Sequence, residues 1–279
     1  MNTEVIYSPD YHRRKGIAVW IDMFRQLYEY RYLLKRLAIK NITVRYKKSW
    51  LSYLWVVATP LLTALIFAFI ASRRIVQFNN PAYAYVVFAL LNITLWQLFA
   101  NTVKAATVSL SSAQSLVTRV NMPREILLLA SCSEPLVQFM IRLLPVLAVF
   151  IVYEVPILPG LPAALMFVIP LMLMALGLGF ILSVINLVTT DINNLVSLLL
   201  LVGMFLTPVL YAEPTGYPFV LLNFINPVSP VLISVHDLIA FGALQKSGLA
   251  VFCWLQATLV FLIGFRFFNL ALPRVVERA

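Results

Sequence analysis

The chain has 279 residues, of which 62% are hydrophobic and only 11% are charged. Soluble domains are about 45–50% apolar and about 25% charged, so the composition excludes a soluble protein and predicts an integral membrane protein. The net charge is +10, and 11 of the 21 Lys and Arg residues fall within residues 1–50. Basic residues beside a hydrophobic segment attract anionic lipid head groups, so we expect membrane lipids, and no nucleic acid, as the partner of this charge.

The N-terminal segment, residues 1–48, is expected in the cytoplasm. Its first 16 residues are polar and lack the apolar core of a cleavable signal peptide. Residues 19–48 contain no Pro or Gly and mix apolar with basic residues, a pattern typical of an amphipathic helix on the inner leaflet. Such a helix either rests on lipid alone or also contacts a partner protein.

The remaining chain, residues 49–279, is expected to form an all-α transmembrane domain. A membrane-spanning helix needs about 20 predominantly apolar residues. By this criterion six segments qualify as transmembrane helices: residues 49–71, 81–103, 126–153, 163–189, 192–212 and 247–265.

A further uncharged run, residues 214–235, contains four prolines. Because proline removes backbone donors and breaks helices, this run predicts short re-entrant helices between the fifth and sixth spans rather than a seventh span. These helices would lie in an outer segment, residues 212–246.

The charge distribution sets the expected orientation. An even number of spans puts both termini on one side of the membrane. With the termini in the cytoplasm, 17 Lys and Arg residues lie on the inner side and three on the outer side. Lys and Arg in short loops favour the cytoplasm, so we expect cytoplasmic termini.

Reactive motifs are missing from the sequence. No GxxxxGK[ST] phosphate-binding loop, no GxSxG element and no paired carboxylates occur, and His12 and His236 are too far apart to suggest a metal site. We therefore expect a transport subunit and no enzyme, with neither catalytic residues nor a metal or cofactor of its own.

Three ionisable or polar residues interrupt the third predicted span. Glu134, Gln138 and Arg142 are spaced by four residues and so share one helix face. They could form a proton relay of an ion-coupled transporter, or a polar stripe whose members satisfy one another.

Four stretches, in order, resemble one family. The sequence VRYKKSWLSYLWVVATPLL (44–62) resembles the N-terminal signature of the membrane subunit of ABC-type polysaccharide exporters, the type-2 ABC permease family, with Ser52 where glycine is usual. SLVTRVNMPREILLLASCSEPLVQF (115–139), INLVTTDINNLVSLLLLVGMFLTPVLY (185–211) and NFINPVSPVLISVHDLIAF (223–241) resemble later parts of that subunit. Thr190 stands where the family often has an Arg before the aspartate, here Asp191.

The resemblance implies a homodimer that exports a lipid-linked polysaccharide such as O-antigen from the cytoplasmic side of a bacterial inner membrane. A separate ATP-binding subunit, in two copies, would hold ATP and Mg²⁺. Export of teichoic acid, of a lipid or of a drug is the alternative within this class, and an ion-coupled or passive channel is the alternative outside it.

Candidate functional residues follow from their position relative to the spans. Charged contacts to phosphate are strong, so the basic residues before the first span are candidates for binding the lipid pyrophosphate: Arg45, Lys47 and Lys48. Aromatic rings that could stack on sugars in the channel are Tyr53, Trp55, Trp96 and Phe99. A short coupling helix in the loop 109–124 would contact the ATPase, with Ser115, Arg119, Pro123, Arg124 and Glu125 as candidates.

Overall fold

The computed structural model describes residues 25–46, 51–73, 84–113, 122–155, 160–213, 216–217 and 219–276. Within these residues the chain is helical and has no strand, which confirms the all-α prediction. The helices are α2 (Arg31–Tyr46), α3 (Leu51–Ser72), α4 (Tyr85–Ser112), α6 (Glu125–Ser131), α7 (Ser133–Val152), α8 (Leu161–Met166), α9 (Val168–Val188), α10 (Asp191–Leu206), η2 (Phe219–Leu221), α11 (Leu222–Ile225), α12 (Ser229–Phe241) and α13 (Ser247–Val276).

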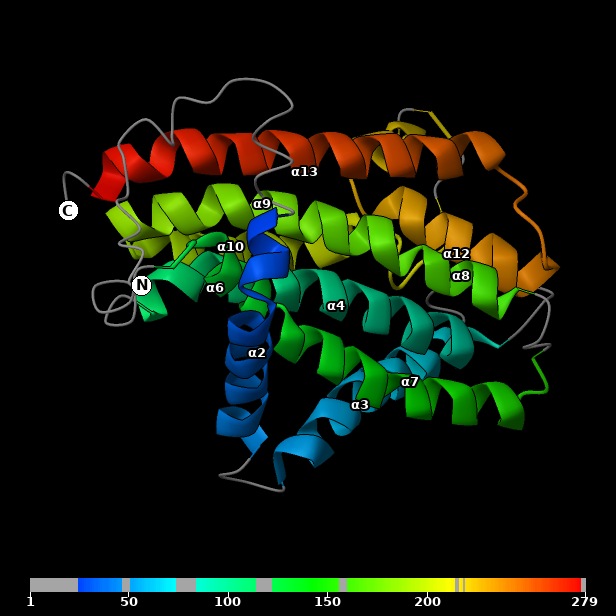
Figure 1. Ribbon diagram of the computed structural model, residues 1–279. Coiled ribbons are helices and arrows are strands. Elements are labelled where there is room, and N and C mark those ends of the chain that lie inside the picture. The colour runs from blue at the N-terminus through cyan, green and yellow to red at the C-terminus, as the bar shows by residue number, and fades with distance from the viewer. Residues whose placement is uncertain are drawn as a thin grey trace.

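Three long helices form the centre of the bundle. α9 packs against both α4 and α13, and α7 and α3 pack on α4 (Figure 1). The α9–α13 contact needs glycine, because a Cβ on Gly264 would lie 2.0 Å from the carbonyl oxygen of Gly177. Small residues that let backbones touch are a usual device of helix packing in membranes, where apolar burial supplies little driving force between helices.

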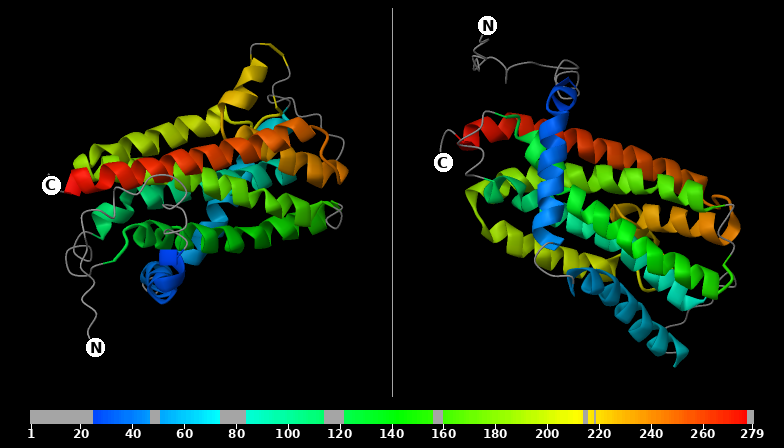
Figure 2. Two further views of the ribbon diagram at one scale, coloured as in Figure 1. Left: turned by 45° about the horizontal axis from the view of Figure 1, so that its top comes forward. Right: turned by 60° about the horizontal axis from the view of Figure 1, so that its bottom comes forward.

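The long helices run alternately between two ends of the bundle, as the views in Figures 1 and 2 agree. We call the end where α2 crosses the bundle the α2 end, and the end that carries α12 the α12 end. At the α2 end, Leu33 and Leu37 pack against a buried cluster that includes Leu110, Leu128 and Phe268. The predicted N-terminal helix, as far as it is described, therefore packs on this chain and does not rest on lipid alone.

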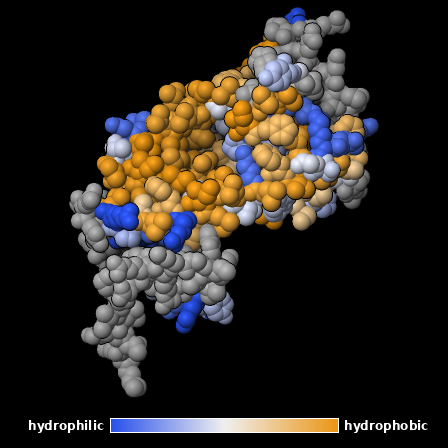
Figure 3. All heavy atoms as spheres, turned by 90° about the horizontal axis from the view of Figure 1, so that it is seen from above, coloured by the Kyte–Doolittle hydropathy of each residue, from blue (hydrophilic) through white to orange (hydrophobic). Residues whose placement is uncertain are grey.

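Four helical stretches among the described residues are long and apolar enough to cross a membrane: Tyr85–Ser112, Glu125–Val152, Leu161–Val188 and Ser247–Val275. Leu54–Ile70 and Asp191–Leu206 are apolar but shorter. The six-span count therefore stays a prediction, and the described residues contain four candidate spans. Figure 3 shows a broad hydrophobic face with hydrophilic residues toward its two ends, as a bilayer requires.

Two helices extend past their predicted ends. α4 continues to Ser112 rather than ending near residue 103, and α13 continues to Val276 rather than residue 265. The serine cluster at 109–112, which was expected to begin the loop, is the last turn of α4, where Ser109 and Ser112 donate to carbonyls three residues earlier. A single lysine and several serines end the apolar run without ending the helix, because both residue types are tolerated in helices.

Two predicted spans are each divided by a short break. The break between α6 and α7 is at Cys132, and the break between α8 and α9 is at Phe167. Each lies three residues before a proline, Pro135 and Pro170, and a proline inside a helix cannot donate to the carbonyl four residues back. The missing amide of each proline is consistent with the break three residues before it, although Pro60, Pro145 and Pro273 are accommodated within unbroken helices.

Short helices occupy the proline-rich segment between α10 and α13, as far as it is described. η2 and α11 are followed by α12, in which ten of 13 residues are buried. The expected re-entry of these helices into the bilayer stays a prediction.

Candidate functional site

Several candidate residues fall outside the described part of the chain. Lys47, Lys48, Ser115 and Arg119 lie there entirely. Arg45 and Tyr53 lie within α2 and α3, but their side chains are not among those described. The lipid-pyrophosphate candidates and most of the predicted coupling helix therefore stay predictions.

The polar residues of the third span form a connected network. Gln138 donates from Nε2 to Oε1 of Glu134 at 2.8 Å, and its own Oε1 accepts from Nδ2 of Asn101 at 3.0 Å and from Nη2 of Arg142 at 3.4 Å. Arg142 also donates from Nε to the carbonyl oxygen of Val56 at 3.2 Å. The network thus joins α7 to α4 and to α3, and Gln138 and Arg142 are 3% and 6% exposed.

A junction between α2 and the α6–α7 break holds the N-terminal helix in place. Asn41 donates from Nδ2 to the carbonyl oxygen of Ala130 at 3.1 Å. The Ser133 hydroxyl lies 2.7 Å from the same carbonyl oxygen and 3.3 Å from that of Ala38 on α2, and its one proton is shared between these two acceptors. The described coupling candidates, Pro123, Arg124 and Glu125, begin α6, which packs directly against α2. A movement of α6 would therefore be transmitted both to α2 and to α7, which follows α6 in the third predicted span.

A cationic–aromatic group lies near the start of α2. The Arg31 guanidinium lies 4.2 Å from the ring centroid of Tyr28 and 5.0 Å from that of Tyr32, and both rings are 70% exposed. A cation held over exposed tyrosine rings is typical of a side-chain set at the membrane–water boundary.

The aromatic channel candidates separate by burial. Trp55 is 57% exposed, whereas Trp96 and Phe99 are 5% and 4% exposed. The two buried rings contact each other at 5.6 Å between centroids, and a Cβ on Gly203 of α10 would lie 3.1 Å from Trp96. Trp96 and Phe99 therefore contribute to packing, whereas the Trp55 ring is exposed on the surface of the chain.

Two of the four quoted sequence stretches meet at the α12 end. Asn226 donates from Nδ2 to the Thr207 hydroxyl at 2.6 Å, and its Oδ1 accepts the Val228 amide at 3.0 Å. The Tyr85 hydroxyl at the start of α4 donates to the carbonyl oxygen of Leu210 at 2.6 Å. The Asn226 bond fixes the end of α10 to the short-helix segment, η2 to α12, and the Tyr85 bond ties the start of α4 to the turn that follows α10.

Asp237 of α12 ties that segment to the start of α13. Its Oδ2 accepts the backbone amides of Gln245 and Lys246 at 3.1 and 3.2 Å. Burial raises the pKa of Asp237, and the two amide hydrogen bonds and the Lys246 charge oppose that rise. Burial likewise lowers the pKa of the neighbouring His236, with Glu213 opposing this shift. The Lys246 ammonium also pairs with the Glu213 carboxylate.

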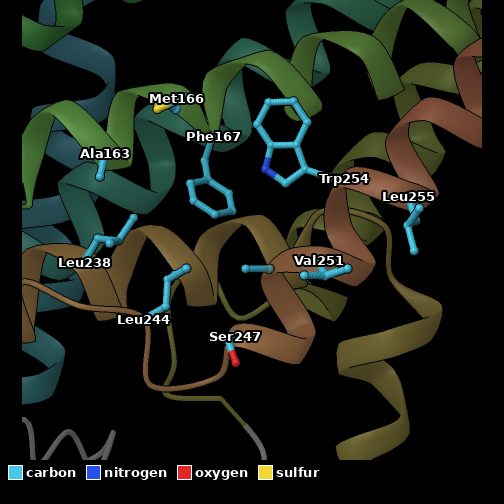
Figure 4. Close-up of a pocket in the computed structure, with 10 residues that line it drawn as sticks. Ala163, Met166, Phe167, Leu238, Leu244, Ser247, Val251, Trp254 and Leu255 are labelled. Atoms are coloured by element: carbon cyan, nitrogen blue, oxygen red, sulfur yellow. The ribbon is translucent and has the colours of Figure 1, made fainter.

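An apolar groove of about 480 Å³ opens between α8, α12 and α13 (Figure 4). Its lining includes Met166, Phe167, Trp254 and Leu255, and Ser247 is the polar member of the lining. Without a charged group it offers nothing to pair with a phosphate. Elsewhere in the described residues no three His, Cys, Asp or Glu side chains gather into a set that could hold a metal ion.

Sequence reasoning missed the partners of several predicted residues. Asn101 and the Val56 carbonyl complete the intramembrane network, and Asn41 and Ser133 make the junction at α2. The partner role of Asn101 could have been predicted, because an asparagine side chain within an apolar span costs free energy unless it forms a hydrogen bond with another polar group. The role of a backbone carbonyl could not have been predicted in this way.

The comparisons with known proteins identify the family. Residues 32–239 match the family described as "ABC-2 type transporter". The chain belongs to this family. It is 29% identical over 250 residues to a Klebsiella pneumoniae protein called "O-antigen export system permease protein RfbA", covering 88% of this chain and 94% of the relative. A Myxococcus xanthus protein of the same name is 30% identical over 197 residues, 70% of this chain and 74% of the relative.

The family assignment confirms the resemblance given above. An ABC-2 type transporter chain with several apolar helices is a multi-pass membrane permease. The first three quoted stretches and all but the last two residues of the fourth lie within the matched residues 32–239, and two of the stretches are in direct contact.

Proposed function

We propose that this chain is the membrane subunit of an ATP-driven exporter that moves a lipid-linked polysaccharide of the O-antigen type across the bacterial inner membrane. The observation that carries the proposal is the likeness over 94% of the length of a relative named as an O-antigen export permease. The absence of a phosphate-binding loop from the sequence supports a separate ATP-binding subunit, which would hold ATP and Mg²⁺.

The working unit in this proposal contains two copies of the chain and two of the ATP-binding subunit. α10 supports a contact with a second copy, because Val196 is its single buried residue and its other faces carry exposed leucines. α3 is exposed in the same way, and both helices pack on α4. The polymer would pass between the copies, along α3 and α10, with Trp55 as a ring on which sugars stack.

The α2–α6 junction is the proposed docking surface for the ATP-binding subunit. It includes Pro123, Arg124 and Glu125. In this proposal the junction, the basic end of the molecule and both termini all lie in the cytoplasm. Residues 1–48 form the interface segment, residues 49–279 the six-span domain, and the short helices in 212–246 re-enter the outer half of the membrane.

The substrate is tested in cells that lack this chain. Lipid-linked polymer should accumulate on the cytoplasmic side and surface polymer should disappear, and the wild-type chain should restore export. Unchanged surface polymer together with increased drug sensitivity would instead support drug export. Unchanged behaviour in both assays would reject an exporter of either substrate.

The ATP-binding partner is tested by purification. The chain alone should hydrolyse no ATP, and it should co-purify with the ATP-binding subunit. Reversing the charge of Arg124 with Arg124→Glu should weaken co-purification, whereas Arg73→Glu, at the far end of α3, should not. Robust hydrolysis by the isolated chain would reject the proposal.

The second copy is tested by cysteine cross-linking. Leu199→Cys on α10 should form a disulfide between copies, whereas Leu259→Cys on α13 should not. The two leucines are 59% and 57% exposed, so they differ in position and not in accessibility. Cross-linking at position 259 alone would place the dimer contact on α13.

A further inference from the structure

The first span is attached to the rest of the chain along a narrow strip. Among the side chains described between residues 54 and 70, Val56, Pro60 and Ala64 are buried. They are spaced by four residues and therefore lie on one face of α3. Leu61 and Phe67 are partly buried against the core, whereas six large side chains of the helix are 50–62% exposed: Leu54, Trp55, Leu62, Leu65, Ile66 and Phe69. Figure 2 shows α3 at the margin of the bundle.

Pro60 leaves a carbonyl of α3 without its usual donor. In an α-helix the carbonyl of residue 56 accepts the amide of residue 60, and proline has no N–H. An unsatisfied carbonyl within a bilayer is costly, so another group must supply the hydrogen bond. Arg142 of α7 does so, with its Nε 3.2 Å from the Val56 oxygen.

The geometry points to Arg142 as a positioning residue that replaces the missing Pro60 amide and thereby holds α3 against α7. The guanidinium is itself oriented, because its Nη2 donates to Gln138, and Gln138 is held by Glu134 and by Asn101 of α4. A guanidinium presents donors in several directions, which lets this one side chain reach both Val56 and Gln138. The hydrogen bonds therefore connect α4 to α7 and α7 to α3, so they help to fix the position of α3.

The consequence for transport rests on the proposed function. Val56 follows Trp55, the exposed ring assigned to the substrate path, so the Arg142 bond fixes where that ring lies. The bond holds the part of α3 that precedes Pro60. A helix is free to bend at proline, so loss of the bond would let residues 51–59 move about Pro60.

The test is a double-mutant cycle on the full chain in detergent. Arg142→Met removes the donor but keeps a long apolar side chain, and Pro60→Ala restores a backbone amide for Val56. We expect Arg142→Met to lower the thermal unfolding midpoint by several degrees in the wild-type background and by less than half as much in Pro60→Ala. Arg142→Lys, which keeps a cationic donor, should retain part of the wild-type midpoint.

Phe139→Leu is the matched control, since Phe139 is a fully buried residue of the same helix. Its effect should be equal in both backgrounds. If Arg142→Met costs the same with and without Pro60, the Val56 bond does not position α3 and the inference is wrong. If Arg142→Met yields no folded protein, Arg142→Lys is compared in the same two backgrounds, and equal losses again overturn the inference.

A distance measurement separates positioning from general stability. Spin labels at Leu54→Cys, which precedes Pro60 on α3, and at Leu144→Cys on α7 lie at residues that are 50% and 67% exposed, and both native cysteines are buried. Arg142→Met should broaden the distance distribution between the labels at a temperature where the protein is folded, and Pro60→Ala should narrow it again. An unchanged distribution would overturn the inference. Neither this readout nor the unfolding midpoint depends on the transported substrate, so failure here leaves the proposed function standing.

Discussion

α4 and α10 are both apolar helices of one bundle, yet they are buried to opposite extents. Twenty of the 28 residues of α4 are buried, whereas Val196 is the single buried residue among the 16 of α10. α4 is also the least hydrophobic of the four stretches long enough to span a membrane. In a bilayer polar groups are kept away from lipid, so the helix that carries Asn92, Asn101 and Thr102 lies inside.

The comparison separates helices that stabilise the fold, here called the scaffold, from helices whose exposed faces are available for assembly or transport. α4, α9 and the face of α13 that packs on α9 hold their geometry through contacts within the chain, so changes there should act on stability. α3 and α10 pack on α4 and have apolar faces that this chain leaves uncovered, as the outer face of α13 also is. Under the proposed function, changes on the uncovered faces of α3 and α10 should act on assembly or export. Paired substitutions, one in each region, test this division.

The largest difference is expected between two tryptophans. Trp96→Ala on α4 should cost about 3–5 kcal/mol in free energy of unfolding, because it removes a buried ring and leaves a cavity. Trp55→Ala on α3 should change stability by about 0.5 kcal/mol or less, as is usual for exposed sites, and should reduce export several-fold. Unfolding in detergent and export in cells measure the two effects. Similar stability losses for both variants would contradict the division.

The next largest effect is expected at the glycine contact between α9 and α13. Gly264→Ala places a Cβ 2.0 Å from the Gly177 carbonyl oxygen. The helices must then separate, which should cost about 1–3 kcal/mol, as overpacking in protein cores does. Gly248→Ala is the control on the same helix, because no atom lies within 4 Å of the added Cβ. Equal unfolding midpoints for the two variants would show that α9 and α13 are not so closely packed.

A smaller loss is expected where the end of α10 meets the short-helix segment. Asn226→Ala removes the hydrogen bonds to Thr207 and to the Val228 amide, and each such bond contributes about 1 kcal/mol, so the loss should be about 1–2 kcal/mol. Asn194→Ala, on the exposed side of α10, should change the free energy of unfolding by about 0.5 kcal/mol or less. If both variants are equally stable, the short-helix segment is not fixed by Asn226.

The sequence predicted the positions of the helices well, because long uncharged runs have few other solutions in a bilayer. Helix ends were less predictable. Lys104 and the serines after it end the apolar run of α4, but a helix does not stop where its hydrophobicity does. The two breaks lie near Pro135 and Pro170, but Pro60, Pro145 and Pro273 lie inside unbroken helices, so a proline in the sequence did not by itself predict a break.

The candidate site was predictable only in part. The spacing of Glu134, Gln138 and Arg142 predicted one polar face, and the structure connects all three. The burial of each ring could not be predicted, because Trp55 and Trp96 lie in similarly apolar stretches of sequence and differ only in what packs against them in the structure. Contacts to backbone atoms, such as Arg142 to Val56, depend on how helices cross, which composition does not encode.

The smallest effect is expected for the ion pair between Lys246 and Glu213 at the α12 end. Their side chains are 42% and 27% exposed, so solvent screens the pair. A cycle of Glu213→Gln and Lys246→Gln should give a coupling of about 1 kcal/mol or less, as for other exposed pairs, and it should fall further in 1 M salt. Asp237 contacts the Lys246 backbone amide, which Lys246→Gln retains, so the cycle isolates the side-chain pair. A salt-independent coupling well above that value would show that the pair is shielded from solvent. The α12 end would then contribute to stability as α4 does, unlike the exposed helices α3 and α10.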